Sequence, residues 1–219
     1  MIRALVTYKE INLRYSGADH QEHIVKHFQK CGDWAQERNY FFEWLCAGEF
    51  HWFFVQGLDA IKNEFYVPGV SSLLNGIEAS LRVTITQISS EDIALPEPSQ
   101  YKVLSNNLIK QAKELGLPVE LLAFPGEDDF HENLESVKPN KVDVCIVKQR
   151  NNICHGNIFE FINSELGPEN SFFTPVSLKP LAESLLTISF AWAQALGKFR
   201  RQHQLLDHDN LKIPEPTHD

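Results

Sequence analysis

The sequence predicts an all-α protein built as an antiparallel helical bundle. Residues 70–89 carry large aliphatic side chains at intervals of three and four, which is the spacing of one helix face. Residues 178–201 show the same spacing, with a tryptophan in the stripe. Short connections between helices of this length favour antiparallel neighbours. The two stripes consist of Leu73, Leu74, Ile77, Leu81 and Ile85, and of Leu181, Leu185, Ile188, Trp192 and Leu196.

Three further helical segments precede the first stripe. Residues 19–31 form a short amphipathic stretch, and residues 33–46 place apolar side chains at helical spacing. Residues 48–65 are dense in aromatic side chains, so we expect this helix near the centre of the bundle. The run Val67-Pro68-Gly69 then interrupts the helical pattern. The aromatic side chains expected in the core are Phe50, Trp52, Phe53 and Phe54.

The second half of the chain alternates helices with loops. Residues 101–115 are helical in pattern, and Gly116 suits the cap at their C-terminal end. Residues 117–140 contain prolines and an acidic run with little regular pattern, which is typical of a functional or mobile loop. Residues 141–155 form the next helix, which ends at Gly156. We divide the chain into an N-terminal helical extension (1–47), a helical bundle (48–203) and a flexible C-terminal tail (204–219).

Composition describes an ordinary globular chain of 219 residues, 43% hydrophobic and 22% charged. No apolar run reaches the roughly 18 residues of a membrane span, and the N-terminus lacks the apolar core of a signal peptide. Four cysteines form no C-x-x-C pair, which argues against a zinc ribbon. Three of them have aromatic or aliphatic neighbours, as reduced core cysteines do, and this fits a reducing cytoplasm. No glycine-rich phosphate loop of an NTPase is present.

The formal net charge of −9 has the wrong sign for a protein that binds nucleic acid over its whole surface. RNA binding would therefore need a local basic patch. Two clusters of basic residues are candidates, although each would equally suit a solvated helix end. They are Lys138, Lys141, Lys148 and Arg150, and Lys198, Arg200, Arg201 and His203.

The run Gln149-Arg150-Asn151-Asn152-Ile153-Cys154-His155-Gly156 concentrates groups that hold a phosphodiester and move a proton. This run resembles the R-x(4–6)-H motif of HEPN domains. Four residues separate its Arg from its His, an Asn follows the Arg, and a Gly follows the His. The run Gly76-Ile77-Glu78-Ala79-Ser80-Leu81-Arg82 is similar to the glutamate-bearing early helix of many such domains. The resemblance covers roughly residues 48–200. HEPN domains are helical bundles, and many are metal-independent endoribonucleases of toxin–antitoxin and phage-defence systems.

This resemblance implies RNA cleavage by the 2′-hydroxyl, without a metal or another cofactor, to leave a 2′,3′-cyclic phosphate. His155 would be the general acid or base, because imidazole changes charge near neutral pH. Arg150 would hold the phosphate bidentately, and Asn151 would donate to the phosphate or orient the imidazole. Glu78, Lys148 and Asn152 are possible supporting residues.

Helix geometry predicts that the site needs two copies of the chain. Arg150 and His155 lie roughly 140° apart around a helix, whereas Asn151 and His155 share a face. One copy also supplies a single imidazole for two proton transfers. We therefore expect a homodimer with a composite site, as the family resemblance also implies, with RNA as substrate and an antitoxin protein as a possible further partner.

Alternatives remain open from the sequence. Arg150 would equally pair with Glu78 inside the bundle, and Glu78 with Arg82 four positions on. The chain would then be a catalytically inactive module that binds a nucleotide, RNA or a protein, or a structural dimerisation domain. Separately, His20, His23 and His27 lie on one helical face and would suit a metal ion, but an exposed histidine face explains them as well.

Overall fold

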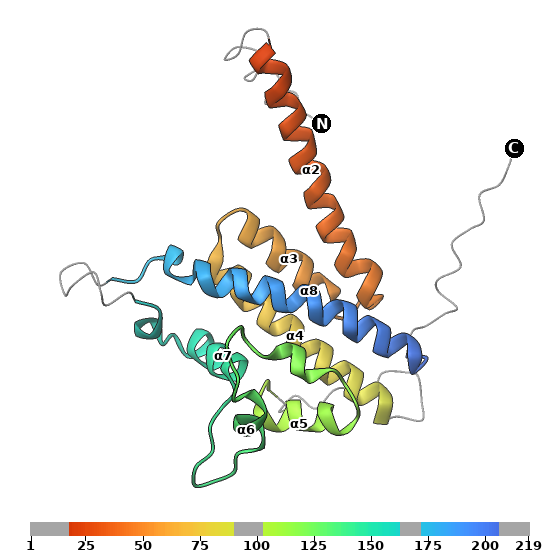
Figure 1. Ribbon diagram of the computed structural model, residues 1–219, viewed down its shortest axis with the longest axis vertical. Helices are drawn as coiled ribbons and strands as arrows, with labels where there is room; N and C mark the ends of the chain where they lie inside the picture. The colour runs from red at the N-terminus through yellow and green to blue at the C-terminus, as the bar shows by residue number, and fades with distance from the viewer. Residues whose placement is uncertain (1–17, 90–102, 163–171, 206–219) are drawn as a thin grey trace, which may run out of the picture. The chain divides into compact units, whose positions relative to one another are not determined.

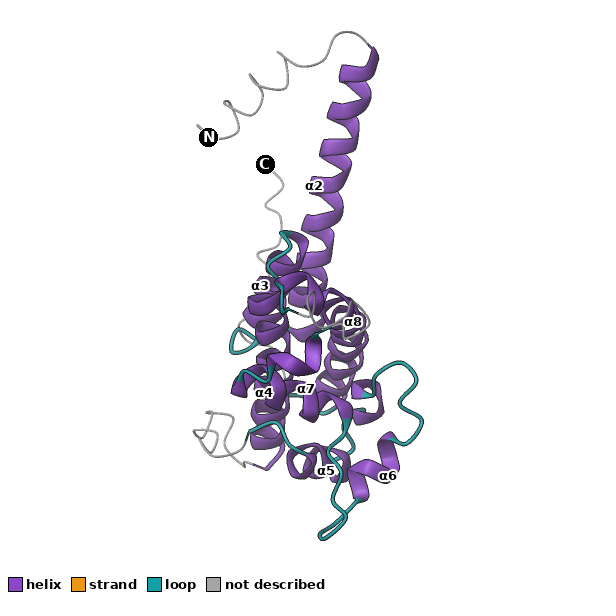
Figure 2. Cartoon of the chain, turned by 90° about the vertical axis from the view of Figure 1, so that its left-hand side faces the viewer, coloured by secondary structure: helices purple, strands orange, loops and turns teal. Residues whose placement is uncertain are grey.

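The computed structural model describes residues 18–89, 103–162 and 172–205, and within them it consists of helices and loops without a strand (Figures 1 and 2). The all-α bundle predicted from the sequence is confirmed. Its α-helices are α2 (Ala18–Leu45), α3 (His51–Lys62), α4 (Tyr66–Ser89), α5 (Asn106–Glu114), α6 (Phe130–Glu135), α7 (Cys145–His155) and α8 (Lys179–Gln202). The short 3-10 helices are η1 (Val119–Leu122), η2 (Ile158–Phe161) and η4 (Pro175–Leu178).

The chain divides into two compact units between Tyr40 and Phe41. Helix α2 supplies the described part of the first unit and contributes Phe41–Leu45 to the second. The two segments predicted at 19–31 and 33–46 are in fact one helix. Gly32 between them is exposed and helical, and a single glycine costs a helix only about 1 kcal/mol relative to alanine. The domain boundaries drawn from the sequence stay a prediction.

Helices α3 and α4 form an antiparallel pair. The Oγ of Ser72 donates to the carbonyl of Phe53 at 2.7 Å, and one turn later on α3 Gly57 lies against Gly69, which comes earlier on α4. Glycines on both helices let the two backbones approach closely. Helix α4 already begins at Tyr66, so the interruption predicted at 67–69 lies in its first turn, where Pro68 has no helical hydrogen bond to remove.

Helices α4 and α8 run in the same direction. The indole Nε1 of Trp192 donates to Ser80 Oγ at 2.9 Å, and two turns later Arg200 Nη1 donates to Thr84 Oγ1 at 3.3 Å. The predicted antiparallel arrangement therefore applies to α3 and α4 and not to this pair. The reason is the long connection between α4 and α8, whose described residues include α5, α6 and α7 (Figure 1).

Stacked aromatic rings fill the core between the end of α2, α3 and α8. The ring of Phe41 lies 5.4 Å from that of Phe54 and 4.7 Å from that of Phe190, measured between centroids. Phe50 is also fully buried, as predicted. Trp52 and Phe53 were wrongly predicted to be core residues, because they lie on the outer side of α3 and are exposed.

The second basic cluster predicted from the sequence is divided by the fold. Arg200 is buried, where its guanidinium donates to Gln87 at 2.9 Å and lies over the Phe50 ring, and burial lowers its pKa. Arg201 is exposed, but it donates to the carbonyl of Glu43 at 2.6 Å and lies over Trp44. These four residues therefore do not form one cationic patch.

The connection between α5 and α7 is more ordered than predicted. Helix α5 ends one residue before Leu115, and Gly116 follows in the left-handed conformation, which fits the predicted stop. The supposedly irregular segment 117–140 contains η1 and α6, which bury Leu122 and Phe130. No helix in the described ranges is long and apolar enough to cross a membrane.

Candidate functional site

The motif run forms helix α7 as predicted, and the helix ends at His155, directly before Gly156. Gly156 adopts a left-handed conformation with φ of 68°, which glycine enters without steric cost. The N–H of Asn157 then donates to the carbonyl of Asn152 at 2.9 Å and closes the last turn. Their side chains pair as well, with Asn157 Nδ2 donating to Asn152 Oδ1 at 3.1 Å. This cap fixes His155 in the last turn of α7.

A carboxylate from the preceding loop supports the N-terminal end of α7. Val144, at the N-cap, has no side chain that accepts a hydrogen bond. Instead, the Oε1 of Glu127 accepts from the N–H of Cys145 at 2.6 Å, and its Oε2 accepts from Phe124 N–H at 2.9 Å. A negative charge at a helix N-terminus is also favoured by the helix dipole. The acidic run at 127–129, predicted as a loop feature, therefore helps to position the motif helix.

Asn106 on α5 hydrogen-bonds to the backbone of the loop that leads into α7. Its side chain is buried, with Nδ2 donating to the carbonyls of Asn133 and Val142 at 3.0 and 2.8 Å. Its Oδ1 accepts from Val144 N–H at 3.2 Å. One amide thus satisfies three backbone groups from two segments. Sequence analysis missed this residue, because its partners lie 27 to 38 positions away along the chain.

Arg150 extends from α7 toward α4 and pairs with Glu78. Its Nη2 lies 3.4 Å from Glu78 Oε2, and the two side chains are only 16% and 13% exposed. The same Glu78 oxygen accepts from the N–H of Leu104 at 2.8 Å, and its other oxygen lies 3.7 Å from Arg82 Nη1. Both pairings of Glu78 that the sequence left open therefore occur together.

His155 and Arg150 do not meet within one chain. His155 is exposed at the end of α7, and among the described residues its ring has no hydrogen bond or ion pair. Arg150, half-buried against α4, contacts Asn151 instead, with Nη1 lying 3.5 Å from Asn151 Oδ1. This separation follows from the roughly 140° between the two positions on an unbroken helix. The predicted catalytic residues are therefore on one helix but not in one cluster.

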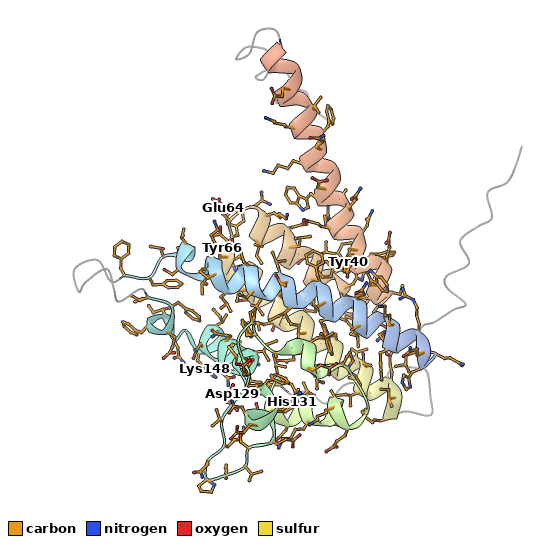
Figure 3. All side chains as sticks on the ribbon, in the orientation of Figure 1. Tyr40, Glu64, Tyr66, Asp129, His131 and Lys148 are labelled. Atoms are coloured by element: carbon orange, nitrogen blue, oxygen red, sulfur yellow. The ribbon has the colours of Figure 1, made fainter. Side chains whose placement is uncertain are left out.

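The first basic cluster is partly neutralised by nearby acids. Lys148 lies 3.6 Å from Glu160, and Lys141 lies 3.1 Å from Asp143. The charges of Lys148 and Asp129, both labelled in Figure 3, act on the Cys145 thiol in opposite directions. Burial is the largest effect there and raises the pKa of the Cys145 thiol, which keeps it protonated. Three of the four cations in this cluster therefore face an acid, since Arg150 pairs with Glu78.

The structure does not test the metal site suggested by the N-terminal histidines. The side chains of His20, His23 and His27 lie outside the described residues, although the backbone there belongs to α2. Among the described residues, no group of three or more histidine, cysteine, aspartate or glutamate side chains is placed to hold a metal ion.

Comparison of the chain with protein-family models, with curated proteins and with solved structures found no match. Membership of the HEPN family therefore stays a prediction from the motif residues.

We expect Glu78→Gln to destabilise the protein by about 1.5–3 kcal/mol, the usual contribution of a hydrogen bond to a charged group. Glutamine still accepts from the N–H of Leu104, but Arg150 loses the negative charge that it faces in a half-buried position. Urea unfolding followed by circular dichroism measures the loss. Glu135→Gln is the matched control, because that carboxylate pairs with Lys113 in solvent and should matter less. Equal stability of both variants would contradict a structural role for the Glu78–Arg150 pair.

Proposed function

We propose that this protein is a HEPN-type, metal-independent endoribonuclease of a toxin or phage-defence kind. His155 transfers protons, Arg150 binds the phosphate and Asn151 assists. The observation that carries the proposal is the motif helix itself, which ends at Gly156 and leaves His155 exposed to solvent. A histidine packed into the core of the bundle would not be accessible to a substrate. In RNA cleavage the 2′-hydroxyl attacks the adjacent phosphodiester, and an accessible imidazole would transfer the protons of this reaction.

The active form would be a homodimer in which two motif helices face each other. The separation of Arg150 from His155 in one chain supports this, because a second copy would bring another imidazole to the phosphate. Apolar side chains directly after α7 also support it, since Phe159 is 83% exposed and Ile158 is exposed beside it. Native mass measurement at micromolar concentration tests the dimer, and a protein that stays monomeric would contradict the composite site.

His155→Ala should reduce cleavage of a labelled RNA pool in EDTA by at least about 10²-fold, the usual contribution of a general acid or base. The fold should be unchanged, because the side chain is exposed. His131→Ala is the matched control, since His131 is an exposed histidine on α6 outside the motif (Figure 3). Equal cleavage by wild type and His155→Ala would contradict the assignment of His155.

A catalytically inactive HEPN module that binds a nucleotide, RNA or a protein partner is the second candidate. The Arg150–Glu78 pair favours it, because an internal carboxylate already engages the guanidinium that would hold the phosphate. The net charge of −9 favours it as well. Binding of RNA by a homogeneous dimer without any cleavage would distinguish this module from the nuclease.

A further inference from the structure

The imidazole of His155 is placed by its backbone and not by a neighbouring side chain. In many enzymes a third group orients the general base through a hydrogen bond. Among the described residues, no group makes such a bond to the His155 ring. His155 is also the last residue of α7, and the ends of helices tend to fray. The cap that follows His155 therefore determines how well the imidazole is held.

Two asparagines stand on either side of His155 and are joined by two hydrogen bonds. The N–H of Asn157 donates to the carbonyl of Asn152 at 2.9 Å, and Asn157 Nδ2 donates to Asn152 Oδ1 at 3.1 Å. The last turn of α7 cannot unwind, and Gly156 cannot leave its left-handed conformation, unless these bonds break. The main-chain bond is that of an ordinary helix cap, whereas the other bond depends on the two amide side chains.

The side-chain bond connects the exposed end of α7 to a buried residue. Asn152 is only 7% exposed, and its Nδ2 has no hydrogen-bond partner among the described residues. Close packing restricts a buried side chain, so Asn152 gives Asn157 a fixed point of attachment. Lys148 and Glu160 also connect α7 to η2 at 3.6 Å, but both are more than half exposed, and such ion pairs stabilise little.

We propose that Asn157 is a positioning residue for RNA cleavage, which holds the imidazole of His155 in place through its bond to Asn152. This inference depends on the proposed function and adds a residue to it. A proton is transferred efficiently only in the correct geometry, and a displacement of about 1 Å can reduce the rate about 10²-fold. Asn157 itself is exposed, so a substitution there leaves the core intact.

Asn157→Ala tests this role, because it removes the side-chain bond and keeps the main-chain bond. For a labelled RNA in EDTA, kcat should fall about 10- to 10²-fold, while KM stays within about twofold of the wild-type value. An interaction that acts only on proton transfer does not contribute to substrate binding. Without RNA, hydrogen exchange at the N–H groups of Gly156 and Asn157 should become faster in this variant.

A second background separates positioning from stability. In the His155→Ala protein, Asn157→Ala should not reduce the residual cleavage further, because the group that it positions is absent. A residue that only stabilised the fold would lower activity in both backgrounds.

Asn63→Ala is the matched control, because Asn63 is also an exposed asparagine that closes the end of a helix. It is the C-cap residue of α3, and its Nδ2 donates to the carbonyl of Asp59 at 2.7 Å. Both variants lose one hydrogen bond of the same kind, so both should lose similar stability in thermal unfolding. Only Asn157→Ala should lose kcat.

The outcomes distinguish this inference from the proposed function. If the wild type cleaves RNA and Asn157→Ala has the same kcat, the inference is wrong and the proposed function stands. An equal loss of kcat in Asn63→Ala would assign the effect to stability, and a rise in KM alone would make Asn157 an RNA contact. Either result overturns the inference. If the wild type does not cleave RNA, the proposed function and the inference both fail.

Discussion

Gly197→Ala is expected to destabilise the protein by about 3 kcal/mol, toward the upper end of the cost of overpacking. In an ordinary helix the same change would stabilise by up to about 1 kcal/mol. The sign reverses because α8 touches the end of α2 at this position. A Cβ on Gly197 would overlap the carbonyl oxygen and carbon of Trp44, and a backbone carbonyl has no rotamer by which to move away. The two helices would have to separate.

Thermal unfolding measures this effect. A domain of 150–250 residues loses roughly 2–4 °C of Tm for each kcal/mol, so we expect a fall of about 6–12 °C. Gly32→Ala is the matched control, because Gly32 is also helical but a Cβ there would meet nothing within 4 Å. This control should unfold at the wild-type temperature or slightly above it. A Gly197→Ala protein as stable as Gly32→Ala would mean that α8 and Trp44 are not in close contact.

The sequence predicted the helices whose apolar pattern is regular. The stripes of α4 and α8 were visible as spacings of three and four, and the ends of α5 and α7 were marked by Gly116 and Gly156. Features that depend on partners were not visible. Whether Trp52 faces inward depends on what packs against α3. The apolar pattern also does not show whether a single glycine such as Gly32, which costs a helix only about 1 kcal/mol, ends that helix. The parallel direction of α4 and α8 was likewise not predicted, because a long connection separates the two helices.

The sequence predicted the residues of the candidate site, but not the residues that position helix α7. Arg150, Asn151 and His155 stand together in the sequence, so a local motif finds them. Glu78 was found as one of two open pairings, and the structure shows that it makes both. Glu127 and Asn106, which hold the N-terminal end of α7, were missed. Each acts through backbone groups far away in the chain, and backbone groups carry no sequence signal.

Asn106→Ala is the second large effect, and it connects the fold to the site. Alanine removes the partner of Val144 N–H and of two carbonyls, those of Asn133 and Val142, at a buried position. Each buried group left without a partner costs about 1–3 kcal/mol. Ser136 Oγ lies 2.6 Å from the Asn133 carbonyl oxygen and 3.1 Å from that of Val142, and its one proton can still satisfy one of these two carbonyls. Two groups are then left without a partner, so we expect a total destabilisation of about 3 kcal/mol, within the roughly 2–6 kcal/mol that two such penalties cost.

The loss should be felt most in the motif helix, because Val144 is its N-cap residue. Hydrogen exchange should become faster in residues 144–150 of Asn106→Ala before the rest of the bundle is affected. If α7 carries the RNA site, cleavage should fall in proportion to the fraction of protein in which α7 has lost its order. Asn107→Ala is the matched control, since the neighbouring asparagine of α5 is exposed. Uniformly faster exchange across the bundle would instead show that Asn106 stabilises the whole fold and not the start of α7.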